Sequence, residues 1–269
     1  MPRNKDADGY IKHLKSLNVP YNVNIKGIDF PIEDTDVYPP GKLTEMFIDY
    51  IIKEKIIEGK VVADLGCGCY ALGIIAAMNG AQMAIGADIN SKAIDCAKQV
   101  IAREGITNAV VIHGEIASLL PSYSGAVDVI LSGPPWDSVT SDTVVGLESD
   151  VLERAFYDVD DSLLRGVMCE GRELYKDKSV GKTYITSSQR VLERVEKLCA
   201  ENEMQFKIVK EEEIELGNPH YILCLSKKEE EKKVEEIIDD HQNVELDLLI
   251  SSQENVGGND SSFCCCAIM

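Results

Sequence analysis

The chain lacks the features of secreted and membrane-spanning proteins. Its first residues, MPRNKDADGY, contain no apolar core of the kind that a secretory signal peptide needs. No run approaches the roughly 18 consecutive apolar residues that indicate a membrane-spanning helix. Nine cysteines are present, but their spacing fits neither a metal site nor a disulfide framework. Cys67 and Cys69 are too close for the usual zinc knuckle, and we interpret both as packing residues. These absences predict a globular protein of the cytosol.

Basic side chains are also scarce. The 269 residues include 27 Lys and Arg against 46 Asp and Glu, which gives a formal net charge of −19. Proteins bind nucleic acids largely through Lys and Arg contacts to phosphates, so this balance disfavours an RNA or DNA substrate. The expected partner is therefore a protein or a small molecule.

The middle of the chain alternates between β-branched runs and helical patterns. The strands expected in this alternation cover 61–66, 83–89, 109–114, 127–133 and 183–188, and the expected helices cover 43–57, 74–78, 91–104, 161–175 and 189–202. Such alternation implies right-handed βαβ crossovers and a parallel sheet. Residues 206–226 have the pattern of two antiparallel strands joined at Gly217-Asn218-Pro219. We predict a doubly wound, seven-stranded α/β fold, mostly parallel with an antiparallel edge strand.

Three segments are expected along the chain. Residues 1–37 form an N-terminal extension, residues 38–226 form the α/β domain, and residues 227–269 form an acidic flexible tail. The last 44 residues contain four lysines and eleven acidic residues, and their Ser, Asn and Gly content is typical of a linker.

A glycine-rich turn follows the first strand of the alternation. The sequence DLGCGCYALG begins at Asp64, and Gly66 and Gly68 allow the backbone to approach a ligand closely. This spacing alone would also suit a dinucleotide. Asp64 disfavours that interpretation, because a carboxylate repels a pyrophosphate and attracts a positively charged amino-acid head group.

Two further carboxylates follow the next two strands. Asp88 ends the second strand, 24 residues after Asp64, at a position suited to the hydroxyls of a ribose. Glu115 follows the third strand and is a candidate for the border of an adenine site, with a plain surface carboxylate as the alternative. Because open α/β sheets bind ligands at the carboxyl ends of their strands, we expect these three side chains to share one site.

These segments resemble a known family. VVADLGCGCYALG and GADIN are similar to the first two motifs of class I S-adenosylmethionine-dependent methyltransferases, and the terminal hairpin is similar to their antiparallel seventh strand. The resemblance covers about residues 38–226, and it implies a Rossmann-like methyltransferase fold with S-adenosylmethionine as cofactor. It assigns the methionine end to Asp64 and to the backbone of Gly66 and Gly68, the ribose to Asp88, and the adenine to Glu115 or Ile116.

The chain departs from this family at Tyr70, where a third glycine is common. A bulky side chain at this position is expected to narrow the loop. A cofactor-binding module without turnover therefore stays open as an alternative.

A second motif follows the fourth strand, in the sequence LSGPPWD. Pro134 and Pro135 fix two backbone angles and remove two amide donors, which leaves carbonyls to accept hydrogen bonds from an amino group. Trp136, the only tryptophan, could stack on a planar acceptor. Asp137 could take a proton from the acceptor.

This segment resembles the Asn/Asp/Ser-Pro-Pro-Tyr/Phe/Trp motif of N-methyltransferases. The resemblance implies a nitrogen acceptor and a catalytic segment from Gly133 to Asp137. Gly133 stands where the motif usually carries a hydrogen-bonding side chain, and Ser132 would have to substitute for it. The alternative is that Pro-Pro-Trp only packs a loop.

Two segments are expected to border the same site. VYPPGKLTE, which precedes the first motif, resembles the part of these enzymes that closes over the cofactor, and Thr44 and Glu45 would then meet the methionine moiety. The alternative for Thr44 is a polar residue at a helix N-terminus. Residues 138–160 are rich in acidic side chains and are expected over the acceptor pocket, which favours a cationic or neutral substrate.

The chain ends in Cys266-Ala267-Ile268-Met269, which has the form of a prenylation signal with a preference for farnesyl. One prenyl chain gives reversible membrane binding, so acylation of Cys264 or Cys265 would supply a second signal. We expect a cytoplasmic enzyme anchored to the cytosolic face of a eukaryotic membrane, with the prenyltransferase of the host or source cell as a partner. A bacterial protein delivered into a host cell would carry the same signal. The alternative is a reactive surface thiol cluster.

Three functions remain open from the sequence. The first is a methyltransferase acting on a nitrogen of a protein or small molecule. The second is an S-adenosylmethionine-binding module that serves as a sensor or interaction protein. The third is a dinucleotide oxidoreductase, which Asp64 and the Pro-Pro-Trp segment disfavour.

Overall fold

A computed structural model of the chain describes residues 4–141, 150–215 and 218–228. Contacts divide the chain into a compact unit, Met1–Lys228, and a second unit, Glu229–Met269. The predicted lipidation residues Cys264, Cys265 and Cys266 lie outside the described residues. None of the helices in the described ranges is both long enough and apolar enough to span a membrane.

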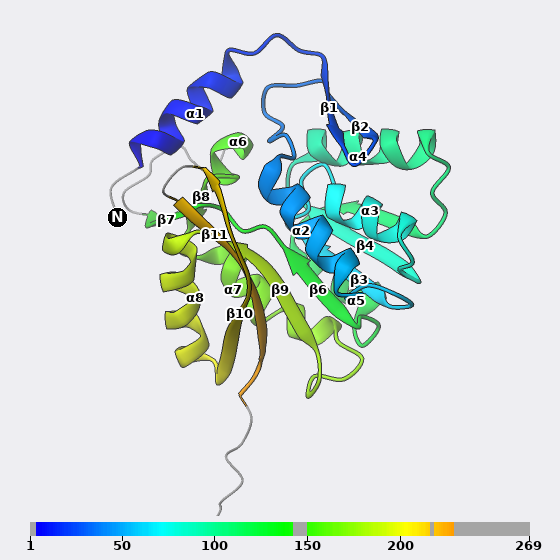
Figure 1. The fold of residues 1–269 in the computed structure, drawn as a ribbon, viewed down its shortest axis with the longest axis vertical. Coiled ribbons are helices and arrows are strands. Elements are labelled where there is room, and N and C mark those ends of the chain that lie inside the picture. Colours follow the sequence, from blue (N-terminus) through cyan, green and yellow to red (C-terminus); the bar gives the residue numbers. More distant parts are fainter. Residues whose placement is uncertain (1–3, 142–149, 216–217, 229–269) are drawn as a thin grey trace, which may run out of the picture. The chain divides into compact units, whose positions relative to one another are not determined.

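The centre of the fold is a seven-stranded sheet in the order β10-β11-β9-β6-β3-β4-β5 (Figure 1). Its strands are β3 (Val61–Leu65), β4 (Met83–Asp88), β5 (Ala109–His113), β6 (Val129–Ser132), β9 (Lys182–Ser187), β10 (Met204–Glu215) and β11 (Asn218–Lys227). Neighbouring strands from β9 to β5 are parallel, and β11 pairs antiparallel with both β9 and β10. The predicted fold class is therefore confirmed, with the antiparallel strand one place in from the edge.

Strand β3 is buried along its whole length. All five of its residues, Val-Val-Ala-Asp-Leu, are buried, as expected for a parallel strand that is covered on both faces. One face is covered by α2 (Lys42–Lys53), α3 (Ala71–Met78) and α4 (Ser91–Arg103). The other face is covered by η1 (Ile116–Leu119), α7 (Ser162–Met168), η4 (Gly171–Leu174) and α8 (Gln189–Glu201), with α5 (Leu120–Tyr123) packed beside η1 and η4.

The single helix predicted over 161–175 is two elements, α7 and η4. The chain turns after Met168, and this turn brings Leu174 and Tyr175 into the core beneath β6 and β9. The apolar pattern of the sequence runs through this break without interruption, because α7 and η4 both bury apolar residues against the same face of the sheet.

Residues 1–37 contain structure that the sequence did not indicate. A hairpin of β1 (Tyr21–Ile25) and β2 (Ile28–Ile32) packs its apolar side chains into the same cluster as α2 and α4. Helix α1 (Lys5–Lys15) joins a separate small core together with β7 (Asp137–Val139), α6 (Val151–Arg154) and β8 (Tyr157–Val159). This small core stands beside the carboxyl ends of the parallel strands, where a ligand site is expected.

Candidate functional site

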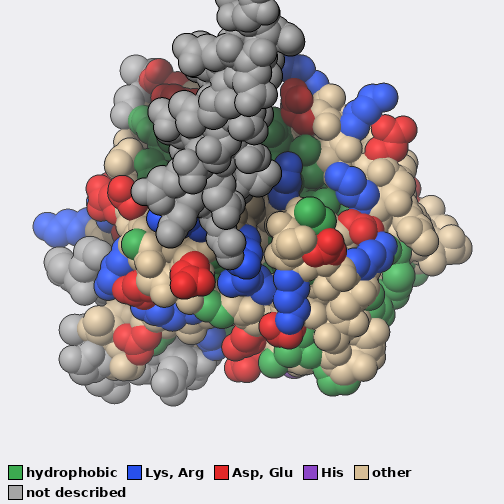
Figure 2. All heavy atoms as spheres, turned by 90° about the horizontal axis from the view of Figure 1, so that it is seen from below, with side chains coloured by type: hydrophobic (Ala, Val, Ile, Leu, Met, Phe, Trp, Pro, Cys, Tyr) green, Lys and Arg blue, Asp and Glu red, His purple; other side chains and the backbone are tan. Residues whose placement is uncertain are grey.

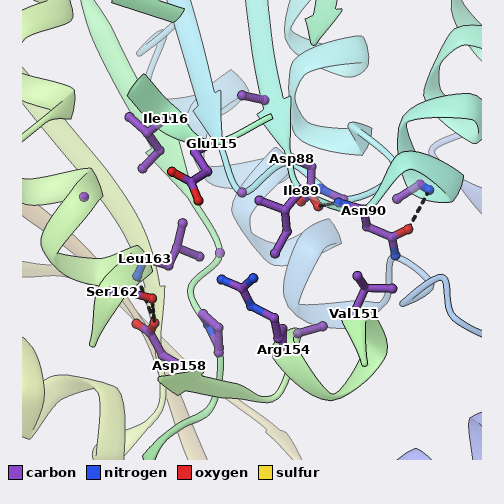
Figure 3. Close-up of a pocket in the computed structure, with 18 of the residues that line it drawn as sticks. Asp88, Ile89, Asn90, Glu115, Ile116, Val151, Arg154, Asp158, Ser162 and Leu163 are labelled. Carbon is purple, nitrogen blue, oxygen red and sulfur yellow. Dashed lines mark hydrogen bonds between the residues drawn. The ribbon is translucent and has the colours of Figure 1, made fainter. Parts of the chain in front are cut away.

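A cavity of about 290 Å³ opens at the carboxyl ends of the parallel strands (Figure 3). Gly66 and Gly68 enter it after β3, Asp88 ends β4, and Glu115 and Ile116 follow β5. Gly133 and Pro135 enter it after β6. Segments that are far apart in the sequence thus meet at one edge of the sheet.

Asp88 is held by the backbone on both carboxylate oxygens. The Gly68 amide donates to Oδ2 at 2.7 Å, and the Asn90 amide donates to Oδ1 at 2.8 Å. Burial raises the pKa of Asp88, and these two hydrogen bonds act in the opposite direction. Each carboxylate oxygen has a second lone pair, so Asp88 can still accept hydrogen bonds from a ligand in the cavity.

Gly66 is required where the chain turns from β3 toward α3. Its φ of +68° is in the left-handed region, and a Cβ on this residue would lie 2.9 Å from a methyl carbon of Leu163. Because Leu163 also lines the cavity, a larger residue at 66 would push into the space that a ligand needs.

Asp64 lies behind the glycine turn and does not line the cavity. Its side chain is buried, Oδ2 accepts a 3.2 Å hydrogen bond from the Gly73 amide, and Oδ1 has no hydrogen-bond partner among the described residues. Burial raises the pKa of Asp64 to about 7. The contact with a methionine head group that the sequence predicts for Asp64 stays a prediction.

The expectation that Tyr70 narrows the loop is wrong. Its ring is fully buried in the core and is absent from the cavity lining. The ring lies against two glycines: a Cβ on Gly73 would lie 1.9 Å from it, and a Cβ on Gly86 would lie 2.5 Å from it. The tyrosine at position 70 is therefore accommodated because Gly73 and Gly86 have no side chains, which leaves space for its ring in the core below the loop.

Among the described residues of the Pro-Pro-Trp segment, Gly133 and Pro135 reach the cavity lining. Ser132 does not substitute for a side chain at 133, because its buried hydroxyl donates to the Leu65 carbonyl at 2.7 Å. A Cβ on Gly133 would instead lie 3.5 Å from the Thr186 hydroxyl. Thr186, near the end of β9, thus places a hydroxyl next to that position.

Trp136 and Asp137 point away from the cavity, toward the N-terminal helix. The Trp136 ring stacks on Tyr10 at 6.1 Å and meets Phe156 edge to face at 5.3 Å. Asp137 accepts hydrogen bonds from Arg190 and from the Asn4 side chain, each at 2.8 Å. Neither these two residues nor Pro134 lines the cavity, so their predicted roles in catalysis stay predictions.

A buried arginine connects the Pro-Pro-Trp segment to the start of α7. Arg194, from α8, donates to the Pro135 carbonyl at 3.0 Å, to Asp158 at 2.8 Å and to Asp161 at 2.7 Å. Asp158 in turn accepts hydrogen bonds from the amides that begin α7. From the sequence, the Pro135 carbonyl was expected to accept a hydrogen bond from the methyl acceptor. In the structure this carbonyl already accepts a hydrogen bond from the Arg194 guanidinium.

Thr44 and Glu45 lie in the first turn of α2, outside the cavity lining. The Gly41 amide donates to the Thr44 hydroxyl at 3.4 Å, which fits the alternative of a polar residue at a helix N-terminus. Their proposed contact with a methionine moiety stays a prediction.

Sequence reasoning missed several residues of the cavity. Tyr38, Arg154 and Glu170 line it. Tyr38 lies in the segment VYPPGKLTE, in which Thr44 and Glu45 were expected at the site instead, and Arg154 and Glu170 come from segments without a recognisable motif. Residues 138–160 were expected over the pocket as an acidic cover; residues 142–149 lie outside the described residues, and the charged residues of the rest that line the cavity are Asp158 and Arg154 (Figure 3). The signal in the sequence that could have pointed to Arg154 is that a basic residue stands in an otherwise acidic segment.

The family model of a methyltransferase domain matches residues 56–242, which is more than half of the chain. The rRNA N(6)-adenosine-methyltransferase METTL5 of Danio rerio is 35% identical over 80 residues, which cover 30% of this chain and 39% of that protein. The ribosomal protein L11 methyltransferase of Caldanaerobacter subterraneus is 29% identical over 118 residues, which cover 44% of this chain and 34% of that protein. The chain thus spans less than half the length of each of these two relatives.

Among solved structures, TYW2 of M. jannaschii in complex with AdoMet has a TM-score of 0.51 at 13% identity. The similarity covers 77% of this chain and 86% of that one. It shows that the two proteins share a fold. Together with the match of the methyltransferase-domain model, it shows that the chain belongs to the class I S-adenosylmethionine-dependent methyltransferases.

Proposed function

We propose that the chain binds S-adenosylmethionine in the cavity and transfers its methyl group to a nitrogen atom of a protein or small molecule. The observation that carries this proposal is that Gly66, Gly68 and Asp88 share one cavity with Gly133 and Pro135. The first three residues correspond to the donor motifs, and the last two correspond to the acceptor motif. S-adenosylmethionine is the cofactor of the family.

The residues of the cavity fit this cofactor. Asp88 retains lone pairs for the two hydroxyls of a ribose. Ile89, Ile116 and Leu163 supply apolar side chains against which a purine can pack. A residue larger than glycine at position 66 would displace Leu163, which lines the cavity.

When bound, S-adenosylmethionine supplies a methyl group on an electrophilic sulfonium. The task of the protein is then to orient the acceptor and to exclude water. Gly133 leaves space beside the end of β6, and Thr186 provides a hydroxyl next to it. Arg194 holds the Pro135 carbonyl in place, which keeps this wall of the cavity rigid.

The acceptor class is argued from charge. The two relatives are named for an rRNA adenosine and for a ribosomal protein, so they support a methyl acceptor of either class. On the end of the molecule seen in Figure 2, basic and acidic side chains are interspersed over the part that is not covered in grey. Lys176 and Lys178 pair with Asp128 and Glu173. Over the whole sequence, 46 acidic side chains against 27 basic ones give a formal net charge of −19, and this balance favours a protein or small molecule over a nucleic acid.

The donor site is tested with Asp88→Ala and a matched control, Asp95→Ala, which removes an exposed carboxylate from the neighbouring α4. We expect Asp88→Ala to weaken the affinity for S-adenosylhomocysteine by about tenfold or more, because hydrogen bonds to a charged group contribute roughly 1.5–3 kcal/mol. Calorimetry on the full chain measures this, with Asp95→Ala unchanged. Equal affinity in both variants would show that the ribose lies elsewhere.

Turnover and acceptor class are tested together in cell lysate with methyl-labelled S-adenosylmethionine. Label that survives ribonuclease and is lost with protease identifies a protein acceptor, and label in the small-molecule fraction identifies the other proposed class. Label confined to RNA would overturn the acceptor class. Donor binding without any transfer would favour the binding module.

We also propose that the chain is tethered to the cytosolic face of a eukaryotic membrane through a prenyl group on Cys266, with acylation of Cys264 or Cys265. The support is the C-terminal sequence Cys-Ala-Ile-Met. Intact-mass measurement on protein from eukaryotic cells is expected to show loss of the last three residues and gain of a farnesyl group, with Cys266→Ser unmodified and released from membranes. A wild-type protein that ends in an unmodified Met269 would contradict this proposal.

A further inference from the structure

One cation enters the cavity without a hydrogen-bonded partner among the described residues. Arg154 ends α6, and Figure 3 shows its guanidinium directed into the cavity, toward the side on which Asp88 and Glu115 lie. Its side chain makes no ion pair or hydrogen bond with any residue in the described ranges, although Asp88, Glu115 and Glu170 line the same cavity. Arg165, Arg190 and Arg194, by contrast, each pair with a carboxylate.

The backbone beneath Arg154 is firmly anchored. Leu152 and Phe156, on either side of it in the sequence, are fully buried in the small core beneath α1. Asp150 caps α6 through the Glu153 amide and pairs with Lys15 of α1. The position of the Arg154 backbone is therefore set by packed neighbours, and the residue is half-buried.

Asp88 is near enough for the Arg154 charge to act on its pKa in the lowering direction, but no described carboxylate is hydrogen-bonded to the guanidinium, so its donors stay available to a ligand. Its planar fork suits a carboxylate or a phosphate, each of which can accept two parallel hydrogen bonds. The lining also contains carboxylates, which suit an ammonium group. A cavity with both kinds of charge is complementary to a zwitterion such as an α-amino acid.

We propose that Arg154 forms an anion subsite of the cavity and binds a carboxylate or phosphate group of a bound ligand. The inference rests on the proposed function, because the donor of that reaction carries an α-carboxylate on its amino-acid end. An acidic group on the methyl acceptor is the other source of the same chemistry. In either case Arg154 orients its ligand by a paired hydrogen bond, and a lysine at this position would supply charge without the fork.

The test compares S-adenosylmethionine with decarboxylated S-adenosylmethionine, which retains the amine and lacks only the carboxylate. If the donor supplies the anion, Arg154→Gln weakens binding of S-adenosylmethionine by about tenfold or more and leaves the decarboxylated ligand unchanged, while Arg154→Lys recovers part of the loss. The control is Arg165→Gln, which removes an exposed ion pair with Glu201 and should alter neither affinity.

A second arm titrates inorganic phosphate into the chain, free and loaded with S-adenosylhomocysteine. If the acceptor supplies the anion, Arg154→Gln binds S-adenosylmethionine and its decarboxylated form as tightly as wild type does. Phosphate binding to the chain loaded with S-adenosylhomocysteine is lost in this variant. The proposal is overturned if Arg154→Gln alters neither donor discrimination nor phosphate binding. If the wild-type chain binds no donor, the proposed function is wrong. The anion subsite is then tested by phosphate binding to the free chain: binding that is lost in Arg154→Gln supports the subsite, and binding that is absent or unchanged contradicts it.

Discussion

At the scale of single residues, Asp64 illustrates how a motif residue can lie behind a site. Its carboxyl group is buried beneath the glycine turn, with one oxygen on the Gly73 amide and the other without a partner among the described residues. Burial raises its pKa to about 7, from an ordinary value of 3.8. The folded chain therefore holds a proton at this group over a range of pH in which the unfolded chain has lost it.

This difference makes a prediction about stability. Between pH 4 and pH 7 the folded state binds more protons at Asp64 than the unfolded state does, so its contribution is greatest at low pH and is lost as the pH rises toward 7. From pH 5 to pH 8 the loss is roughly 2–3 kcal/mol. Asp64→Asn removes this titration, and its urea unfolding free energy should fall less over that interval than that of wild type. Parallel pH profiles for the two proteins would show that Asp64 ionises normally; Asp95→Asn, at an exposed carboxylate, is the control.

At the scale of elements, α3 and β4 approach each other through glycines that enclose the Tyr70 ring. A Cβ on Gly73 of α3 would lie 1.9 Å from that ring, and one on Gly86 of β4 would lie 2.5 Å from it. The Tyr70 hydroxyl has no partner among the described residues, so the ring is held by packing. The two glycines and the tyrosine therefore form one steric unit beneath the glycine turn.

Replacing a glycine by alanine should change the stability of the fold in opposite directions in α3 and in α1. Gly73→Ala is expected to destabilise the fold by roughly 1–3 kcal/mol, because the added methyl group overlaps a fully buried ring. Gly9→Ala, in α1, is the matched control: its Cβ would meet no atom within 4 Å, and alanine favours a helix by about 1 kcal/mol. Thermal or urea unfolding of both variants measures the contrast. Equal stability of Gly73→Ala and wild type would mean that the ring moves aside at little cost.

At the scale of the whole molecule, the sheet could be predicted because its strands bury continuous apolar runs. The alternation from 61 to 133 located β3, β4, β5 and β6 to within a few residues. The hairpin β1–β2 and helix α1 escaped prediction, because the extension they form has a polar composition and buries only isolated residues such as Phe30 and Ile11. Their partners, α4 and β8, are distant in the sequence.

The cavity could be predicted only where a motif marks a strand end. Asp88 and Gly133 follow strands with strong patterns, and both line the cavity. Arg154 and Glu170 come from segments whose course depends on packing against α1 and the core, which single-sequence patterns do not encode. The direction of the Trp136 ring depends in the same way on its stacking with Tyr10, a residue more than a hundred positions away.

The antiparallel course of β11 decides where the rest of the chain departs. Because β11 runs against its parallel neighbours, Lys227 stands beside Met204 and close to the beginning of β9, at the end of the sheet opposite the cavity (Figure 1). The last described residue, Lys228, therefore lies at the base of the sheet, and the cavity opens at the opposite end.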